Sequence, residues 1–106
     1  MDPKTLARCE ARANILKALA HPTRVFIVEE LRLGKLCVCE LQARIGADVS
    51  TVSKHLSVLR NAGLVEDEKR GSQVFYSLRL CCVSEFLDCA ERAARENAQR
   101  QMEAVR

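Results

Sequence analysis

The sequence predicts a mainly helical fold that carries one small β-hairpin. Apolar residues recur at spacings of three and four over much of the 106 residues, as they do on the buried side of helices. The stretch 65–78 differs, with two short extended segments around a glycine turn. Aromatic residues are 4% of the chain and Trp is absent, which suits short helices packed through aliphatic side chains better than a β-sandwich. At this length we expect one domain, residues 1–106.

Two helices are expected in the first third of the chain. Residues 4–20 form the first, and its apolar residues make one stripe: Leu6, Cys9, Ala13, Leu16 and Ala20. Pro22 suits the first position of the second helix, because its missing N–H would have no partner there. His21, just before it, is expected to act as a cap or solvent contact rather than as a metal ligand.

The stretch from Asp48 to Val65 predicts a helix with one apolar and one polar side. Asp48 can cap its first turn, and Gly63 suits the position just after its end. The apolar stripe is Val49, Val52, Leu56 and Leu59. The polar side is almost free of carboxylates, and we expect it to face a DNA groove through Ser50, Thr51, Ser53, Lys54 and His55. A short helical segment at 39–45, across the turn Gly46-Ala47, gives helix-turn-helix spacing.

A β-hairpin is predicted directly after this helix. Residues 65–69 and 73–78 are its strands, and Arg70-Gly71-Ser72 is the turn. Near the tip, Lys69, Arg70 and Gln73 are expected to meet DNA phosphates or the minor groove. The acidic run 66–68 would repel phosphate, so we expect it to face away from DNA.

Three stretches resemble the ArsR/SmtB family of dimeric winged-helix repressors, which sense metals, metalloids or redox species. Thr51–Val65 resembles the recognition-helix signature of that family, and Leu16–Arg24 resembles the junction between its first two helices. Leu36–Leu41 resembles the metal-binding motif of its arsenic, cadmium and lead sensors. The resemblance covers residues 12–80 and implies a winged helix-turn-helix fold in a homodimer.

Six cysteines are a high count for 106 residues. The N-terminus Met1–Lys4 lacks the apolar stretch of a signal peptide, so we expect a reducing, cytoplasmic location. Thiols in such a compartment more often bind metal or sense oxidants than form structural disulfides.

Cys37 and Cys39 stand at the start of the predicted third helix. The partial positive charge of a helix N-terminus favours thiolates, and thiolates are soft metal ligands. The best-known arsenic sensors of the family carry a third cysteine three residues later, where this chain has Gln42. The third ligand is therefore open: Cys9, the C-terminal cysteines or the partner subunit could supply it.

The last helix is expected over residues 83–102, with a stripe of mostly small apolar residues. We expect it to pair with the first helix across a two-fold axis. Cys82 and Cys89 are seven residues apart on one helical face, and with Cys81 they form an alternative metal or redox cluster. Asp88 is the only Asp of this helix and it has no His, so a zinc site of the family's type is not expected.

The predicted function is a repressor that binds double-stranded operator DNA as a homodimer. The resemblance implies release by As(III) or Sb(III) bound to cysteine thiolates, with no organic cofactor. A net charge of +3 permits DNA binding, and no apolar run reaches the ~20 residues of a membrane span.

Three alternatives stay open. A cadmium or lead sensor would use the same fold with a fourth ligand. A thiol-redox or persulfide sensor would use Cys81 and Cys82, or a pair of cysteines from different parts of the chain, without metal. An enzyme, a dithiol oxidoreductase, is disfavoured because the sequence has no βαβ pattern and no Cys-x-x-Cys.

Overall fold

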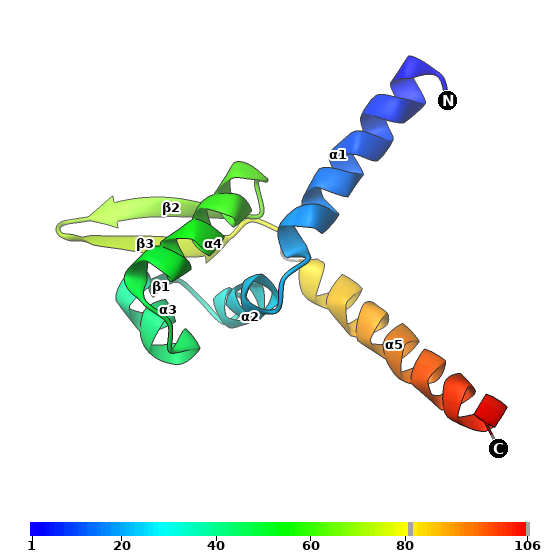
Figure 1. Ribbon diagram of the computed structural model, residues 1–106. Helices are drawn as coiled ribbons and strands as arrows, with labels where there is room; N and C mark the ends of the chain where they lie inside the picture. Colours follow the sequence, from blue (N-terminus) through cyan, green and yellow to red (C-terminus); the bar gives the residue numbers. More distant parts are fainter. Residues whose placement is uncertain (81, 106) are drawn as a thin grey trace.

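A body of three helices and a small sheet carries two projecting helices, one at each end of the chain (Figure 1). The computed structural model describes residues 1–80 and 82–105. The elements follow in the order α1 (Pro3–Leu19), α2 (Pro22–Leu31), β1 (Leu36–Cys37), α3 (Val38–Ile45), α4 (Val49–Asn61), β2 (Val65–Arg70), β3 (Gln73–Leu78) and α5 (Val83–Val105). The mainly helical fold with one β-hairpin is confirmed.

The core lies where α2, α3 and α4 pack against one another and against the sheet. Each of these helices contributes side chains with no solvent exposure, such as Ile27, Leu41 and Leu56. Leu64, also fully buried, follows the end of α4 and leads into β2. Of the apolar stripes predicted from spacing, that of α4 enters this cluster from Val52 onward, whereas the stripe predicted for α1 stays outside it.

The sheet has the order β1-β3-β2, with both pairs antiparallel. The strand β1 was not predicted, because two residues are too few to show a period. The hairpin turn is also one residue shorter than predicted: Arg70 pairs with Gln73, so only Gly71 and Ser72 lie between the strands. Gly71 has a φ of 61°, which a tight two-residue turn requires.

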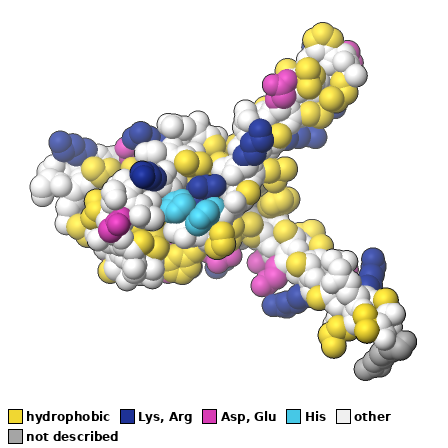
Figure 2. All heavy atoms as spheres, viewed as in Figure 1, with side chains coloured by type: hydrophobic (Ala, Val, Ile, Leu, Met, Phe, Trp, Pro, Cys, Tyr) yellow, Lys and Arg dark blue, Asp and Glu magenta, His cyan; other side chains and the backbone are white. Residues whose placement is uncertain are grey.

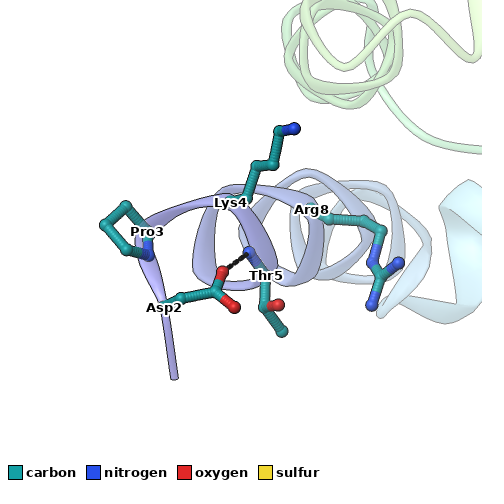
Figure 3. Close-up of a pocket in the computed structure, with 5 residues that line it drawn as sticks. All are labelled: Asp2, Pro3, Lys4, Thr5 and Arg8. Atoms are coloured by element: carbon teal, nitrogen blue, oxygen red, sulfur yellow. Dashed lines mark hydrogen bonds between the residues drawn. The ribbon is translucent and has the colours of Figure 1, made fainter.

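The first turn of α1 is stabilised by an N-cap residue and a proline. Pro3 occupies the first position, and the Asp2 carboxylate accepts a hydrogen bond of 2.7 Å from the backbone N–H of Thr5 (Figure 3). The side chains of Lys4 and Arg8 point away from this cap. The start of α1 is thus a capped helix end that stands clear of the core.

Only the C-terminal end of α1 packs on the body, through Ala18 and Leu19. The predicted stripe is largely uncovered in the single chain: Leu6 is 42% and Leu16 is 49% exposed. The radius of gyration is 16.7 Å, where a compact chain of this length would have about 13 Å. The excess comes from the two projecting helices, which diverge from their bases (Figure 1).

The last helix is longer than predicted and reaches Val105. Val83 is its only buried side chain among the described residues, and Phe86 and Met102 are 50% and 73% exposed. Among the described residues, no helix is long and apolar enough to cross a membrane.

Candidate nucleic-acid interface

Three side chains anchor α4 to the body. Val52, Leu56 and Leu59 have no solvent exposure, as their spacing predicts. Val49 was expected in the same stripe but is 52% exposed, because it lies in the first turn, at the edge of the core. The helix is therefore held along one side from its second turn onward, and its opposite side stays free.

Both ends of α4 have the predicted local chemistry. Asp48 Oδ1 accepts a 2.7 Å hydrogen bond from the backbone N–H of Thr51 and a 3.1 Å bond from the hydroxyl of Ser50. Hydrogen bonding by Thr51, and then by Ser50, holds the pKa of the Asp48 carboxyl below its ordinary value. At the other end Gly63 has a φ of 82°, and Leu64 N–H bonds the Leu59 carbonyl in a Schellman motif.

The predicted DNA-facing residues of α4 fall into two groups. Ser50, Thr51, Ser53 and Lys54 are exposed, whereas His55 is half-buried. The hydroxyl proton of Ser50 is already given to the Asp48 cap, which leaves its oxygen as an acceptor. No carboxylate lies between Val49 and Asn61, so the exposed side of α4 can approach a polyanion without like-charge repulsion from within the helix.

His55 has partners that the sequence did not reveal. Its Nδ1 lies 3.2 Å from Nη1 of Arg24, and its ring centroid lies 4.4 Å from that of His21. Figure 2 shows the two histidine side chains in contact on this face, beside basic side chains. Burial lowers the pKa of His55 below 6.5, and the charges of His21 and Arg24 lower it further.

His21 itself fulfils the expectation of a helix cap. It is the N-cap residue of α2, and its Nδ1 accepts a 3.1 Å hydrogen bond from the backbone N–H of Thr23. Pro22 occupies the first helical position, as predicted.

The wing residues predicted to meet DNA are exposed, but one of them is already paired. Lys69 forms no salt bridge in the described structure and Gln73 is uncharged, whereas Arg70 Nε lies 3.2 Å from Glu68 Oε1. The Arg70 guanidinium also lies 5.6 Å from the centroid of the Phe75 ring. Lys35 approaches the other Glu68 oxygen at 3.3 Å, and bonding by Arg70 and then Lys35 lowers the pKa of Glu68. Of the three acids in the run 66–68 that was expected to repel phosphate, Glu68 is thus paired with two cations.

The cysteines at the start of α3 differ in exposure. Cys37 is the N-cap residue and only 5% exposed, and its backbone N–H donates a 3.2 Å hydrogen bond to Glu40 Oε1. Cys39 lies in the first turn and is exposed. The strand β1 places Cys37 opposite Phe75 of β3, a link between the cysteine pair and the wing that spacing could not indicate.

The remaining cysteines are dispersed in the single chain. Cys9 is exposed on α1, and Cys82 and Cys89 are exposed at the base and on the side of α5. Cys81 lies outside the described residues. Within residues 1–80 and 82–105 of one chain, no three His, Cys, Asp or Glu side chains come together in a way that could hold a metal ion. Cys9 therefore does not join Cys37 and Cys39 within one subunit.

A helix-turn-helix followed by a β-hairpin wing, with a capped and carboxylate-free outer helix face, defines the class of winged-helix DNA-binding regulators rather than enzymes. Residues 21–67 match the sequence pattern described as "Bacterial regulatory protein, arsR family". The chain belongs to this family.

Relatives and solved structures agree with this assignment. The HTH-type transcriptional regulator NmtR of Mycobacterium tuberculosis is 45% identical over 76 residues, which are 72% of this chain and 63% of that protein. The chain thus spans less than two thirds of this relative's length. The crystal structure of the transcriptional repressor BigR from Xylella fastidiosa is similar with a TM-score of 0.70 and 34% identity, covering 84% of this chain and 92% of that one. A homodimeric winged helix-turn-helix DNA-binding domain from Mycobacterium bovis has a TM-score of 0.78 at 25% identity, covering 94% of this chain and 93% of that one.

Proposed function

We propose that this chain is a transcriptional repressor that binds operator DNA as a homodimer through α4 and the wing. The observation that carries the proposal is the outer face of α4. Thr51, Ser53 and Lys54 are exposed there, on a helix that Asp48 caps and whose inner side is fully buried. A rigid helix with donors and no carboxylate on its free side suits major-groove contacts.

Dimerisation is supported by the uncovered apolar residues of α1 and α5. Figure 2 shows hydrophobic side chains along both projecting helices. Where the helices meet, a hollow of about 290 Å³ is lined mainly by apolar side chains, among them Leu16, Leu19 and Phe86. Exposed apolar surface of this extent marks an interaction site, and the same helices of a second copy would cover it symmetrically. The similar Mycobacterium bovis domain is described as homodimeric.

A dimer would present two copies of α4 to the DNA. Two-fold related recognition helices fit successive major grooves when they stand about 34 Å apart. Operator sites for this chain are therefore expected to be palindromic, with half-sites one helical turn apart. A ligand that alters the angle between the subunits would release DNA without touching α4.

The proposed inducer is As(III) or Sb(III), held by Cys37 and Cys39. Trivalent arsenic and antimony are soft ions that favour thiolates. The donor set fits in part, because two thiols lie at the start of α3. No third ligand lies beside them within the described residues of one chain, so it would have to come from Cys9, from the C-terminal cysteines or from the partner subunit once the dimer has assembled. No organic cofactor enters this proposal.

The positions of the two thiols give the inducer a mechanical effect. Cys37 is buried in its N-cap position and Cys39 is exposed two residues further along the chain, so engaging both would require the first turn of α3 to move. Cys37 is also paired with Phe75, so that movement acts on the wing strand β3 directly. Because α3 packs against α4, the same movement disturbs the recognition helix.

The test is an anaerobic titration of the reduced protein on a fluorescent DNA duplex selected by the protein from a random pool. Arsenite, antimonite, cadmium and zinc are added in parallel. Release by arsenite or antimonite alone, at one ion per subunit, is the expected result. Release by cadmium alone, or by peroxide and not by any ion, would replace the metalloid proposal with a cadmium or thiol-redox sensor of the same fold.

Two double variants locate the site. Cys37→Ser/Cys39→Ser is expected to bind DNA and to lose the arsenite response. The matched control Cys82→Ser/Cys89→Ser is expected to keep it. The reverse pattern would assign the response to the C-terminal cysteines. A wild-type protein that selects no duplex at all would contradict the repressor proposal itself.

A further inference from the structure

Arg24 joins three helices through one side chain. It lies in the first turn of α2, where its Nε donates a 2.6 Å hydrogen bond to the carbonyl of Ala18 near the end of α1. Its Nη1 lies 3.2 Å from Nδ1 of His55 on α4. The side chain is half-buried. One guanidinium thus bridges a projecting helix and the recognition helix.

The chemistry of the guanidinium fixes the proton positions around it. Arg carries only donors, so Nδ1 of His55 must be the acceptor and the ring proton must lie on Nε2. The neighbouring neutral His21 must also carry its ring proton on Nε2, because its Nδ1 accepts a hydrogen bond from the backbone N–H of Thr23. The two rings lie 4.4 Å apart at 45°, so each limits the rotation of the other.

We propose that Arg24 is a positioning residue for operator recognition: it holds His55 as the Nε2–H tautomer and ties α4 to the end of α1. This inference rests on the proposed operator binding, but the tautomer that it assigns does not depend on DNA. His55 then offers one defined donor, Nε2–H, at the edge of the recognition face. Without the contact to Arg24, the ring of His55 could carry its proton on either nitrogen and could rotate about χ1 and χ2.

Protonation would oppose this arrangement. A second proton on His55 would place an N–H against the guanidinium donor and a cation beside a cation. The charged or titratable groups that act on His55 are Arg24 from α2 and His21 from its N-cap, while α1 contributes the uncharged carbonyl of Ala18. None of these is a carboxylate that would favour the charged form.

The hydrogen bond from Arg24 to the Ala18 carbonyl also couples the recognition helix to α1. Ala18 lies near the base of a helix whose apolar side chains Leu6 and Leu16 are largely uncovered. A change in the angle of α1 would move the Ala18 carbonyl and, through Arg24, the side chain of His55. Arg24 therefore connects subunit arrangement with the recognition helix.

The first experiment uses long-range ¹H–¹⁵N correlation spectra of the histidine rings in the DNA-free protein. We expect His55 in the wild type to carry its proton on Nε2 with Nδ1 unprotonated at pH 7.5. In Arg24→Gln we expect a mixture of both tautomers and a higher titration midpoint for His55. Arg32→Gln, which removes the same charge from the exposed far end of α2, should leave the His55 signals unchanged.

The second experiment measures affinity for the selected duplex between pH 5.5 and 8. Arg24→Gln is expected to bind about tenfold more weakly at pH 7.5 and to show a displaced pH profile, with Arg32→Gln as the unchanged control. A wild-type His55 protonated on Nδ1 would overturn the inference even if Arg24→Gln failed to fold. An Arg24→Gln protein with wild-type ring signals and affinity would overturn it too. If the wild type bound no duplex while the tautomer result held, the operator proposal would fail instead.

Discussion

Arg60 in the last turn of α4 and Asp67 on β2 form a salt bridge of 3.1 Å between Nη1 and Oδ2. Both side chains are partly exposed, so the pair contributes at most about 1 kcal/mol to stability. Its consequence is geometric, because it joins the recognition helix to the hairpin that follows it. The helix and the wing are therefore expected to approach DNA as one unit.

The acidic strand of the wing limits its attraction for DNA, and Glu68→Gln tests this. Glu68 pairs with both Lys35 and Arg70, so removing its charge by this substitution leaves both cations free to contact DNA. Each additional phosphate contact steepens the plot of log affinity against log salt concentration by about 0.9. We expect tighter binding at low salt and a slope that is larger by about one to two.

The matched control is Glu66→Gln on the same strand. It removes the same charge, but Glu66 forms no salt bridge in the described structure, so no cation is released. Identical slopes for the two variants would mean that Lys35 and Arg70 do not reach phosphate. The measurement is fluorescence anisotropy with the selected duplex from 50 to 300 mM salt.

The inner face of α4 should be a strong determinant of stability. Leu56 has no solvent exposure, and truncation of such a side chain costs about 2–5 kcal/mol through lost burial and the cavity left behind. Leu56→Ala is expected to lower the free energy of unfolding, measured by urea denaturation, by an amount in this range. Val58→Ala, on the same helix at 39% exposure, should cost well under half as much. Equal losses in the two variants would contradict the assigned inner face.

The uncovered residues of α1 and α5 predict the oligomeric state. Leu16→Glu and Phe86→Glu each place a charge in the hollow between the two helices. If a second copy covers this surface, both variants should sediment as monomers and bind the duplex weakly. Leu33→Glu is the control, because Leu33 is 75% exposed, lies in the turn after α2 and does not line this hollow. A wild type that already sediments as a monomer would contradict the dimer.

The elements of this fold were predictable where local chemistry repeats over several residues. Asp48, the buried triplet of α4 and Gly63 each carry a signal that depends only on neighbours in sequence. The same holds for Pro22 and the glycine turn of the wing. The strand β1 carried no such signal, since its two residues become a strand only by pairing with β3.

Parts of the candidate site that depend on distant partners could not be predicted. The contact of Arg24 with His55 spans 31 residues, and the salt bridge of Lys35 with Glu68 spans 33. Spacing placed His55 on the polar face of α4, but only the tertiary fold shows that it is half-buried against His21. The burial of Cys37 and the exposure of Cys39 likewise follow from β1 and not from the Cys-Val-Cys spacing.

The burial of His55 makes the stability of the protein depend on pH just below neutrality. Burial, then the charges of His21 and Arg24, lower the pKa of His55 in the folded chain below 6.5. As the pH falls through about 6.5, the unfolded chain therefore takes up a proton before the folded chain does. The contribution of neutral His55 to the free energy of unfolding is full above pH 6.5 and is lost as the pH falls toward the lowered folded pKa.

We expect the urea midpoint of the wild type to fall between pH 7.5 and 5.5, and to fall less in His55→Gln, which has nothing to titrate at that position. The carboxyls whose pKa values are lowered, such as Asp48 and Glu68, titrate below this window and do not contribute to the difference. His21→Asn keeps a side-chain acceptor for the Thr23 N–H but removes the ring that packs against His55, so it shows how much of the fall depends on that contact. An equal fall in the wild type and in His55→Gln would show that the proton is taken up elsewhere, and His55 would then be as freely solvated in the folded chain as in the unfolded one.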